Sequence, residues 1–80
     1  MNVSSYWQWA SSRGLAVSTE DKEILGKIDA LSNIKNWSEA EQNVMNCAYW
    51  FICQFDIPST DERQREYFQK LIDVARSHFN

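Results

Sequence analysis

Twelve consecutive residues, from Val44 to Phe55, contain only two polar side chains, Asn46 and Gln54. This run is too short to cross a bilayer, because a membrane-spanning helix needs roughly 20 apolar residues. Burial of apolar side chains is the main driving force of folding. We therefore expect the rest of the chain to fold around this run and cover it.

The aromatic residues of the run favour a strand, but the residues upstream favour a helix. Ser38 and Glu41 have the spacing of a capping box, in which the hydroxyl and the carboxylate each accept a backbone N–H of the other residue. The segment from this cap to the end of the run has the length of a helix. The pattern predicts a helix over about 38–55, and we expect it to be the central helix.

The two sides of this predicted helix differ in polarity. Trp50 is a large apolar residue on the side that carries Asn43, Asn46 and Gln54. Either another helix of this chain covers Trp50, or Trp50 anchors a binding partner, since tryptophan is enriched at interface hot spots. The opposite side is apolar and is predicted to face the core: Val44, Met45, Cys47, Ala48, Phe51, Ile52 and Phe55.

Two further helices are indicated by caps followed by apolar residues at helical spacing. Ser18 is the expected N-cap of one, with Asp29 on its solvent side. Ser59 and Glu62 form the capping box expected for the other. The buried stripes of the two helices are Ile24, Leu25, Ile28 and Leu31 in the first, and Phe68, Leu71, Ile72, Ala75 and Phe79 in the second.

The N-terminal segment is rich in aromatic residues and too short to be stable alone. We expect Asn2 or Ser4 to be its N-cap and Gly14 its C′ residue. With only two glycines and one proline, the chain favours a few helices over many short strands. We therefore predict a single all-α domain over 1–80, a small compact bundle with principal helices at about 18–34, 38–55 and 59–78 and a short aromatic-rich helix at about 3–13.

Charge and cysteine content narrow the class of protein. The net charge is −3, which argues against nucleic acid as a partner. Cys47 and Cys53 are six residues apart on one predicted helix and cannot reach each other. The first twelve residues lack the basic and apolar regions of a signal peptide. We expect a cytoplasmic protein without disulfides and without a membrane partner.

The chain carries no recognisable catalytic constellation. Its one histidine, His78, lies in a predicted last helical turn. A cation is favourable there because it interacts with the negative end of the helix dipole, so its presence needs no functional explanation. The two cysteines and this histidine lack the spacing of a zinc site, and no glycine-rich phosphate loop is present. We predict a non-enzymatic protein with no catalytic residue, no metal and no cofactor.

We expect a small protein-binding module, an inhibitor or modulator of a larger protein, similar in character to phage inhibitors and immunity proteins. One alternative is a homodimeric scaffolding protein. A less favoured alternative is a nucleic-acid-binding regulator that uses Arg63, Arg65, Lys70 and Arg76. The predicted contact residues for the protein partner are Trp50, Tyr49, Trp7, Trp9, Tyr6 and Trp37, with Glu39 and Glu41 as a polar rim.

Overall fold

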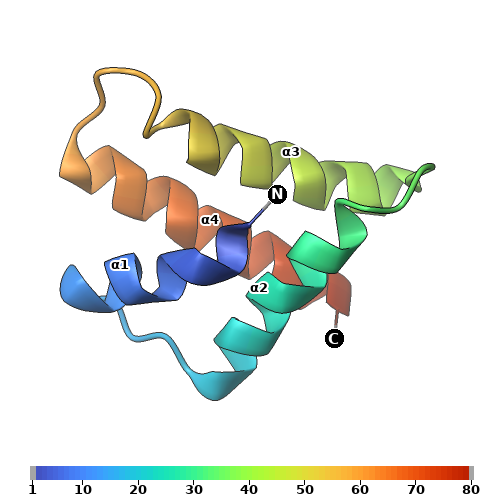
Figure 1. Cartoon of the computed structure of the whole chain (residues 1–80), viewed down its shortest axis with the longest axis horizontal. Coiled ribbons are helices and arrows are strands. Elements are labelled where there is room, and N and C mark those ends of the chain that lie inside the picture. Colours follow the sequence, from blue (N-terminus) through green and yellow to red (C-terminus); the bar gives the residue numbers. More distant parts are fainter. Residues whose placement is uncertain (1, 80) are drawn as a thin grey trace.

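A computed structural model of the chain describes residues 2–79 (Figure 1). The described part is all-helical, as predicted, with three principal helices and a short N-terminal one. The predicted ends are too late in two places, since the helices predicted over 18–34 and 38–55 stop at Leu31 and Cys53. The elements are a 3₁₀ turn η1 (Val3–Ser5), α1 (Tyr6–Ser12), α2 (Thr19–Leu31), α3 (Glu39–Cys53) and α4 (Asp61–Phe79).

The caps of α2 and α3 form as the sequence predicts. The Ser38 hydroxyl accepts the Glu41 N–H at 3.2 Å, and the Ser38 N–H donates to the Glu41 carboxylate at 2.8 Å. Ser18 and Asp21 form the same reciprocal pair at the start of α2. Each box satisfies backbone N–H groups that the first turn of a helix leaves without partners.

The predicted cap of α4 is wrong by one residue. The Thr60 hydroxyl, not that of Ser59, accepts the N–H of Arg63 at 3.1 Å. The Ser59 hydroxyl instead donates to the side-chain oxygen of Gln54 at 3.0 Å. Ser59 and Thr60 could each cap α4. Because the Ser59 hydroxyl is bonded to Gln54 at the end of α3, Thr60 is the residue that caps the helix.

The N-terminal segment ends as predicted but begins differently. Gly14 has φ +82° and its N–H donates to the Ser11 carbonyl, while the Leu15 N–H donates to the Ala10 carbonyl. These two bonds form a Schellman C-cap, which favours glycine. Asn2 is the N-cap residue of η1, one of the two expected alternatives, but neither its side chain nor that of Ser4 accepts a first-turn N–H of the segment.

The cap of this segment comes from another helix. The carboxylate of Asp29, in α2, accepts the N–H groups of Val3 and Ser4 at 2.6 and 3.0 Å. Sequence periodicity places Asp29 on the solvent side of α2, and the structure corrects this. The carboxylate is half-buried and fixes η1 on α2, which places α1 beside the bundle.

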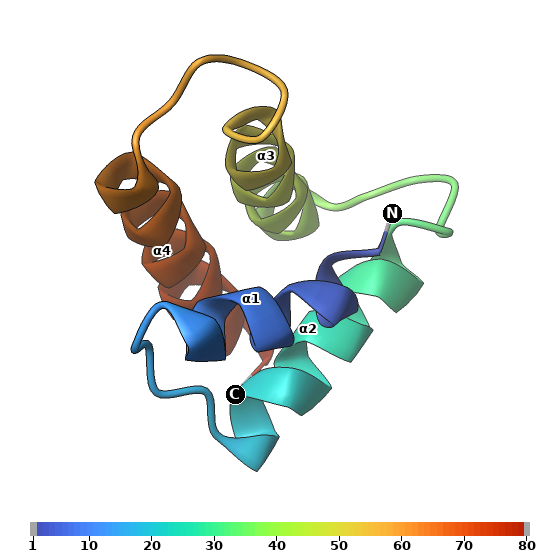
Figure 2. The same ribbon diagram turned by 60° about the vertical axis from the view of Figure 1, so that its left-hand side comes forward.

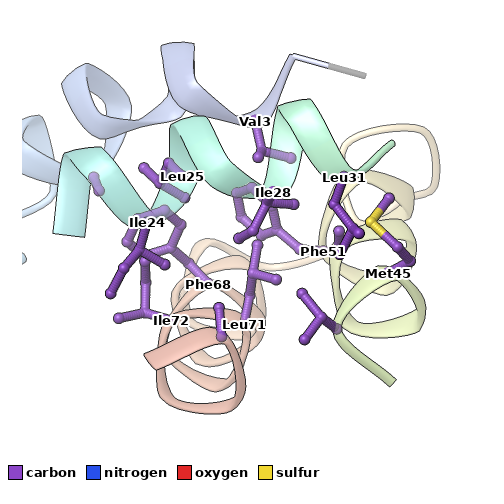
Figure 3. Close-up of a cluster of buried hydrophobic side chains, with 14 residues drawn as sticks. Val3, Ile24, Leu25, Ile28, Leu31, Met45, Phe51, Phe68, Leu71 and Ile72 are labelled. Carbon is purple, nitrogen blue, oxygen red and sulfur yellow. The ribbon is translucent and has the colours of Figure 1, made fainter. Parts of the chain in front are cut away.

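α3 and α4 lie side by side and antiparallel, and α2 crosses them (Figures 1 and 2). Their fully buried side chains meet in one core, in which Phe51 of α3 is the largest. Figure 3 shows Leu25 and Ile28 of α2 directed toward Phe68 and Leu71 of α4, with Val3 of η1 above them. All elements except the loops therefore contribute to a single core.

The prediction that helix 38–55 is the central helix, wrapped by its neighbours, holds for only one of its sides. One side of α3 is fully buried through Val44, Met45 and Ala48. The side that carries Tyr49 and Trp50 is open to solvent. α3 is thus an outer helix of the bundle, packed mainly on α4 (Figure 2).

Candidate protein-binding face

Two large aromatic side chains on α3 are exposed. Trp50 is 59% exposed and Tyr49 is 50% exposed. No other helix covers Trp50, so the first of the two alternatives given for this residue is wrong. An exposed indole on an otherwise polar helix side is costly to keep in water, because it leaves much apolar area unburied.

Trp50 stands between two hollows. One, of about 140 Å³, lies at the seam of α3 and α4 and is lined by Cys47, Trp50, Tyr67 and Lys70. The other, of about 240 Å³, is lined by Asn46, Tyr49, Trp50 and Cys53. We define the Trp50 face as the residues that line these two hollows.

At the α4 side of the Trp50 face, two cations, Arg63 and Lys70, flank Tyr67. Arg63, Glu66, Tyr67 and Lys70 line a third hollow of about 230 Å³, which adjoins the first through Tyr67 and Lys70. The Arg63 guanidinium lies 5.6 Å from the centre of the Tyr67 ring, and its Nη2 donates to the Tyr67 hydroxyl at 3.4 Å. Arg63 is thereby held against the ring.

Gln54 supports this arrangement from inside the protein. Sequence periodicity places it on the polar side of α3, but its side chain is only 2% exposed. Its amide oxygen accepts bonds from Ser59 and from Arg63 Nε, at 3.0 and 3.2 Å, and its amide nitrogen donates to the Trp50 carbonyl at 3.1 Å. Buried polar groups need such partners, so Gln54 fixes the α3–α4 connection beside the Trp50 face.

Four of the predicted contact residues lie elsewhere and are half-buried. Tyr6 and Trp9 belong to an aromatic cluster that also contains Phe51, Phe55 and Phe68, with ring centres 5.0 to 5.8 Å apart between the two groups. The N-terminal segment therefore lays an aromatic face on the end of α3. Trp9 is occupied in this packing and does not join Trp50 in one surface, whereas Tyr6 also lines a hollow of about 610 Å³ with Tyr49, which belongs to the Trp50 face.

Trp7 and Trp37 are also engaged within the chain. The Lys22 ammonium lies 4.1 Å from the centre of the Trp7 ring. The Trp37 indole N–H donates to the Leu31 carbonyl at 2.9 Å, so Trp37 provides a partner for a carbonyl at the end of α2. Of the six aromatic residues predicted to form one contact set, the structure leaves two, Tyr49 and Trp50, exposed by about half or more of their surface.

The two predicted rim carboxylates stand at the start of α3. Glu39 is exposed there, and Glu41 is held in the capping box with Ser38. The Ser38 backbone N–H, and then its hydroxyl, lower the pKa of Glu41 below the ordinary value of 4.5. A rise of roughly 1.5 Å per residue along a helix places both carboxylates about two and a half turns or more from Trp50.

Three of the arginines have carboxylate partners within the chain, and two of them share Asp61. Arg13 and Arg65 both contact Asp61, at 2.6 and 3.2 Å, and Arg76 is paired with Asp21. By contrast, neither Arg63 nor Lys70 has an ion pair with a carboxylate among residues 2–79. Of these two cations, Lys70 lines a hollow together with Trp50.

The reactive side chains are not gathered into a cluster. Cys47 and Cys53 are free and half-buried. Within residues 2–79, no group of three or more histidine, cysteine, aspartate or glutamate side chains is placed to hold a metal ion. In the same range, no helix is both long and apolar enough to span a bilayer.

Comparison with protein-family models, with curated proteins and with solved structures found no match. The candidate face therefore rests on the geometry of this chain alone. Sequence reasoning singled out Trp50 and Tyr49 but missed the association of Tyr67 and Lys70 with them. The spacing of Arg63, Tyr67 and Lys70 places them on one side of α4, and only the packing of α4 on α3 brings that side to Trp50.

Proposed function

We propose that the chain is a small non-enzymatic protein-binding module, an inhibitor or modulator of a larger protein, with Trp50 and Tyr49 as its anchors. The observation that carries this proposal is the 59% exposure of Trp50 between two hollows. Tryptophan and tyrosine in such positions dominate many interfaces, because they bury a large apolar area with few rotatable bonds. Exposed aromatic residues flanked by pockets are also typical of surfaces that become covered.

The homodimeric alternative uses the same face. A two-fold interface is self-complementary, so Trp50 of one copy would have to fill a hollow of its partner. Light scattering across a hundredfold dilution separates the two functions. A mass that stays at one chain, 9.4 kDa, supports the module, and a concentration-dependent doubling supports the dimer.

The nucleic-acid alternative has less support than the other two. Arg65 and Arg76, two of the four residues assigned to it, already pair with carboxylates of the chain. Binding phosphates with them would require breaking these pairs. Nucleic acid is therefore the least favoured of the three partners.

The test is a differential capture experiment with proteins of the native host. The bait is the whole chain, compared with Trp50→Ala and with Ile34→Ala, which truncates an exposed apolar side chain (49%) in the α2–α3 loop. We expect a protein that binds the wild type and Ile34→Ala but is lost with Trp50→Ala, identified by mass spectrometry. Loss with both variants, or with neither, contradicts the proposal.

A further inference from the structure

We infer that the partner presents an acidic segment in which a large apolar side chain stands beside a carboxylate. The apolar side chain enters the hollow lined by Cys47, Trp50, Tyr67 and Lys70, and the carboxylate meets the Lys70 ammonium. This inference rests on the proposed function and adds the chemistry of the partner.

The hollow at the α3–α4 seam suits a single apolar side chain. Its volume is about 140 Å³, close to the roughly 150 Å³ of an apolar cavity that admits benzene. Two of the four residues that line it, Trp50 and Tyr67, are aromatic, and the others are Cys47 and Lys70. A phenyl or branched aliphatic group would therefore contact ring faces or edges on two sides, which is favourable for aromatic pairs.

The positive charge of Lys70 beside the hollow determines which kind of residue the partner should carry next to its docked apolar side chain. Lys70 lines both the seam hollow and the adjoining hollow of α4. It has no carboxylate partner among the described residues. A partner carboxylate placed there gains a charge pair that is partly shielded from water by the docked apolar group, and such pairs are stronger than fully exposed ones.

Glu66 also lines the adjoining hollow, together with Arg63. Its negative charge limits how many carboxylates this surface accepts, since two cations stand against one anion. We therefore place one partner carboxylate at Lys70 rather than an extended acidic run. A basic segment would bring its cations toward Lys70 and Arg63, and like charges brought together at an interface are unfavourable.

The experiment is a selection of displayed random peptides on the immobilised whole chain, with Trp50→Ala as the counter-selection target. The probes are then synthetic copies of the enriched peptides, measured by fluorescence polarisation. We expect enriched peptides with phenylalanine, tryptophan or leucine next to aspartate or glutamate. Their affinity should fall about tenfold with Lys70→Glu and should weaken with added salt.

Lys35→Glu is the matched control. Lys35 is exposed in the α2–α3 loop, lines none of the three hollows, and its reversal changes the net charge by the same amount. An affinity that falls equally with Lys35→Glu overturns the inference, because the effect would then be one of overall charge. Circular dichroism of each variant verifies that the fold is kept.

The remaining outcomes separate this inference from the proposed function. Enriched peptides that depend on Trp50 but are basic or uncharged overturn the acidic partner and leave the protein-binding face standing. Absence of any Trp50-dependent peptide contradicts both. A chain that self-associates through Trp50 in light scattering assigns the face to a second copy, and the inference is then wrong.

Discussion

Two carboxylates of α2 join separate elements of the fold. Asp21 is 6% exposed and accepts bonds from Arg76 of α4 and from the Ser18 N–H. Asp29 accepts the first two N–H groups of η1. A charged group withdrawn from water is tolerated only with such partners. Single residues of α2 thus fix the positions of both the N-terminal segment and α4.

Asp21 makes folding stability depend on pH. Its burial raises the pKa, but the hydrogen bond and charge of Arg76 and the bonds from Ser18 outweigh this, so the pKa lies below the ordinary 3.8. A lowered pKa in the folded state means stability that is present above the unfolded value and lost as the pH falls through the folded value. We predict that Asp21→Asn loses about 1.5–3 kcal/mol of unfolding free energy at neutral pH.

Urea unfolding near neutral pH and at about pH 3 measures this effect. The difference between wild type and Asp21→Asn should shrink at the lower pH, because the Asp21 carboxylate of the unfolded chain is then largely protonated and the stability it confers is lost as the pH falls toward the lowered folded-state pKa. Asp56→Asn is the control, since Asp56 is exposed in the α3–α4 loop. An undiminished difference at low pH would show that shape, rather than charge, makes Asp21 important.

At the scale of residues, periodicity in the sequence predicts which residues share one side of a helix. It does not predict which other elements of the fold that side contacts. Trp50 lies on the predicted helix side that carries Asn43 and Asn46, and the structure leaves it exposed there. Gln54 occupies the same side and is buried, because the turn after α3 brings Ser59 and Arg63 onto it. Tyr67 and Lys70 join the Trp50 face only through the way α4 packs on α3, which periodicity does not specify.

The starts of α2 and α3 and the end of α1 are the best-specified features at the scale of elements. Ser18, Ser38 and Gly14 act within a few residues of their own positions, so their roles can be read from local spacing. The start of η1 is capped by Asp29, 26 residues away from Val3. Such a cap depends on tertiary contact and lies beyond local pattern reasoning.

The two glycines of the chain should respond oppositely to alanine. Gly14 has φ +82° at the C-cap of α1, where a Cβ is unfavourable by about 1 kcal/mol. Gly26 lies within α2, and a Cβ built there meets nothing within 4 Å, so alanine should gain up to about 1 kcal/mol from helix propensity. Chemical unfolding should therefore show Gly14→Ala less stable, and Gly26→Ala more stable, than the wild type.

Each glycine variant is the control for the other, since both add one methyl group to an uncrowded position. A loss of stability in Gly26→Ala would mean that α2 needs the freedom of glycine. No loss in Gly14→Ala would mean that the Schellman cap is dispensable. Either result would contradict the account of how these helices are bounded.

For the molecule as a whole, the aromatic cluster joins distant parts of the chain. Tyr6 and Trp9 of α1 contact Phe51 of α3, Phe55 of the following turn and Phe68 of α4. A chain of 80 residues buries only roughly 60–65% of its unfolded surface, so a few large rings carry much of the available burial. The N-terminal segment is therefore an integral part of the fold and should unfold with it.

Replacing Trp9 should accordingly affect the entire molecule, whereas replacing Trp50 should not. Trp9→Ala removes a ring that touches three others besides Tyr6, and we expect a loss of about 3 kcal/mol. Trp50→Ala, at an exposed position, should stay within about 0.5 kcal/mol of the wild type. In all three proteins, near- and far-ultraviolet circular dichroism should report the same melting temperature, because packing and helices are lost together. A near-ultraviolet signal that disappears before the helices would mean that α1 detaches first and that the cluster does not unite the fold.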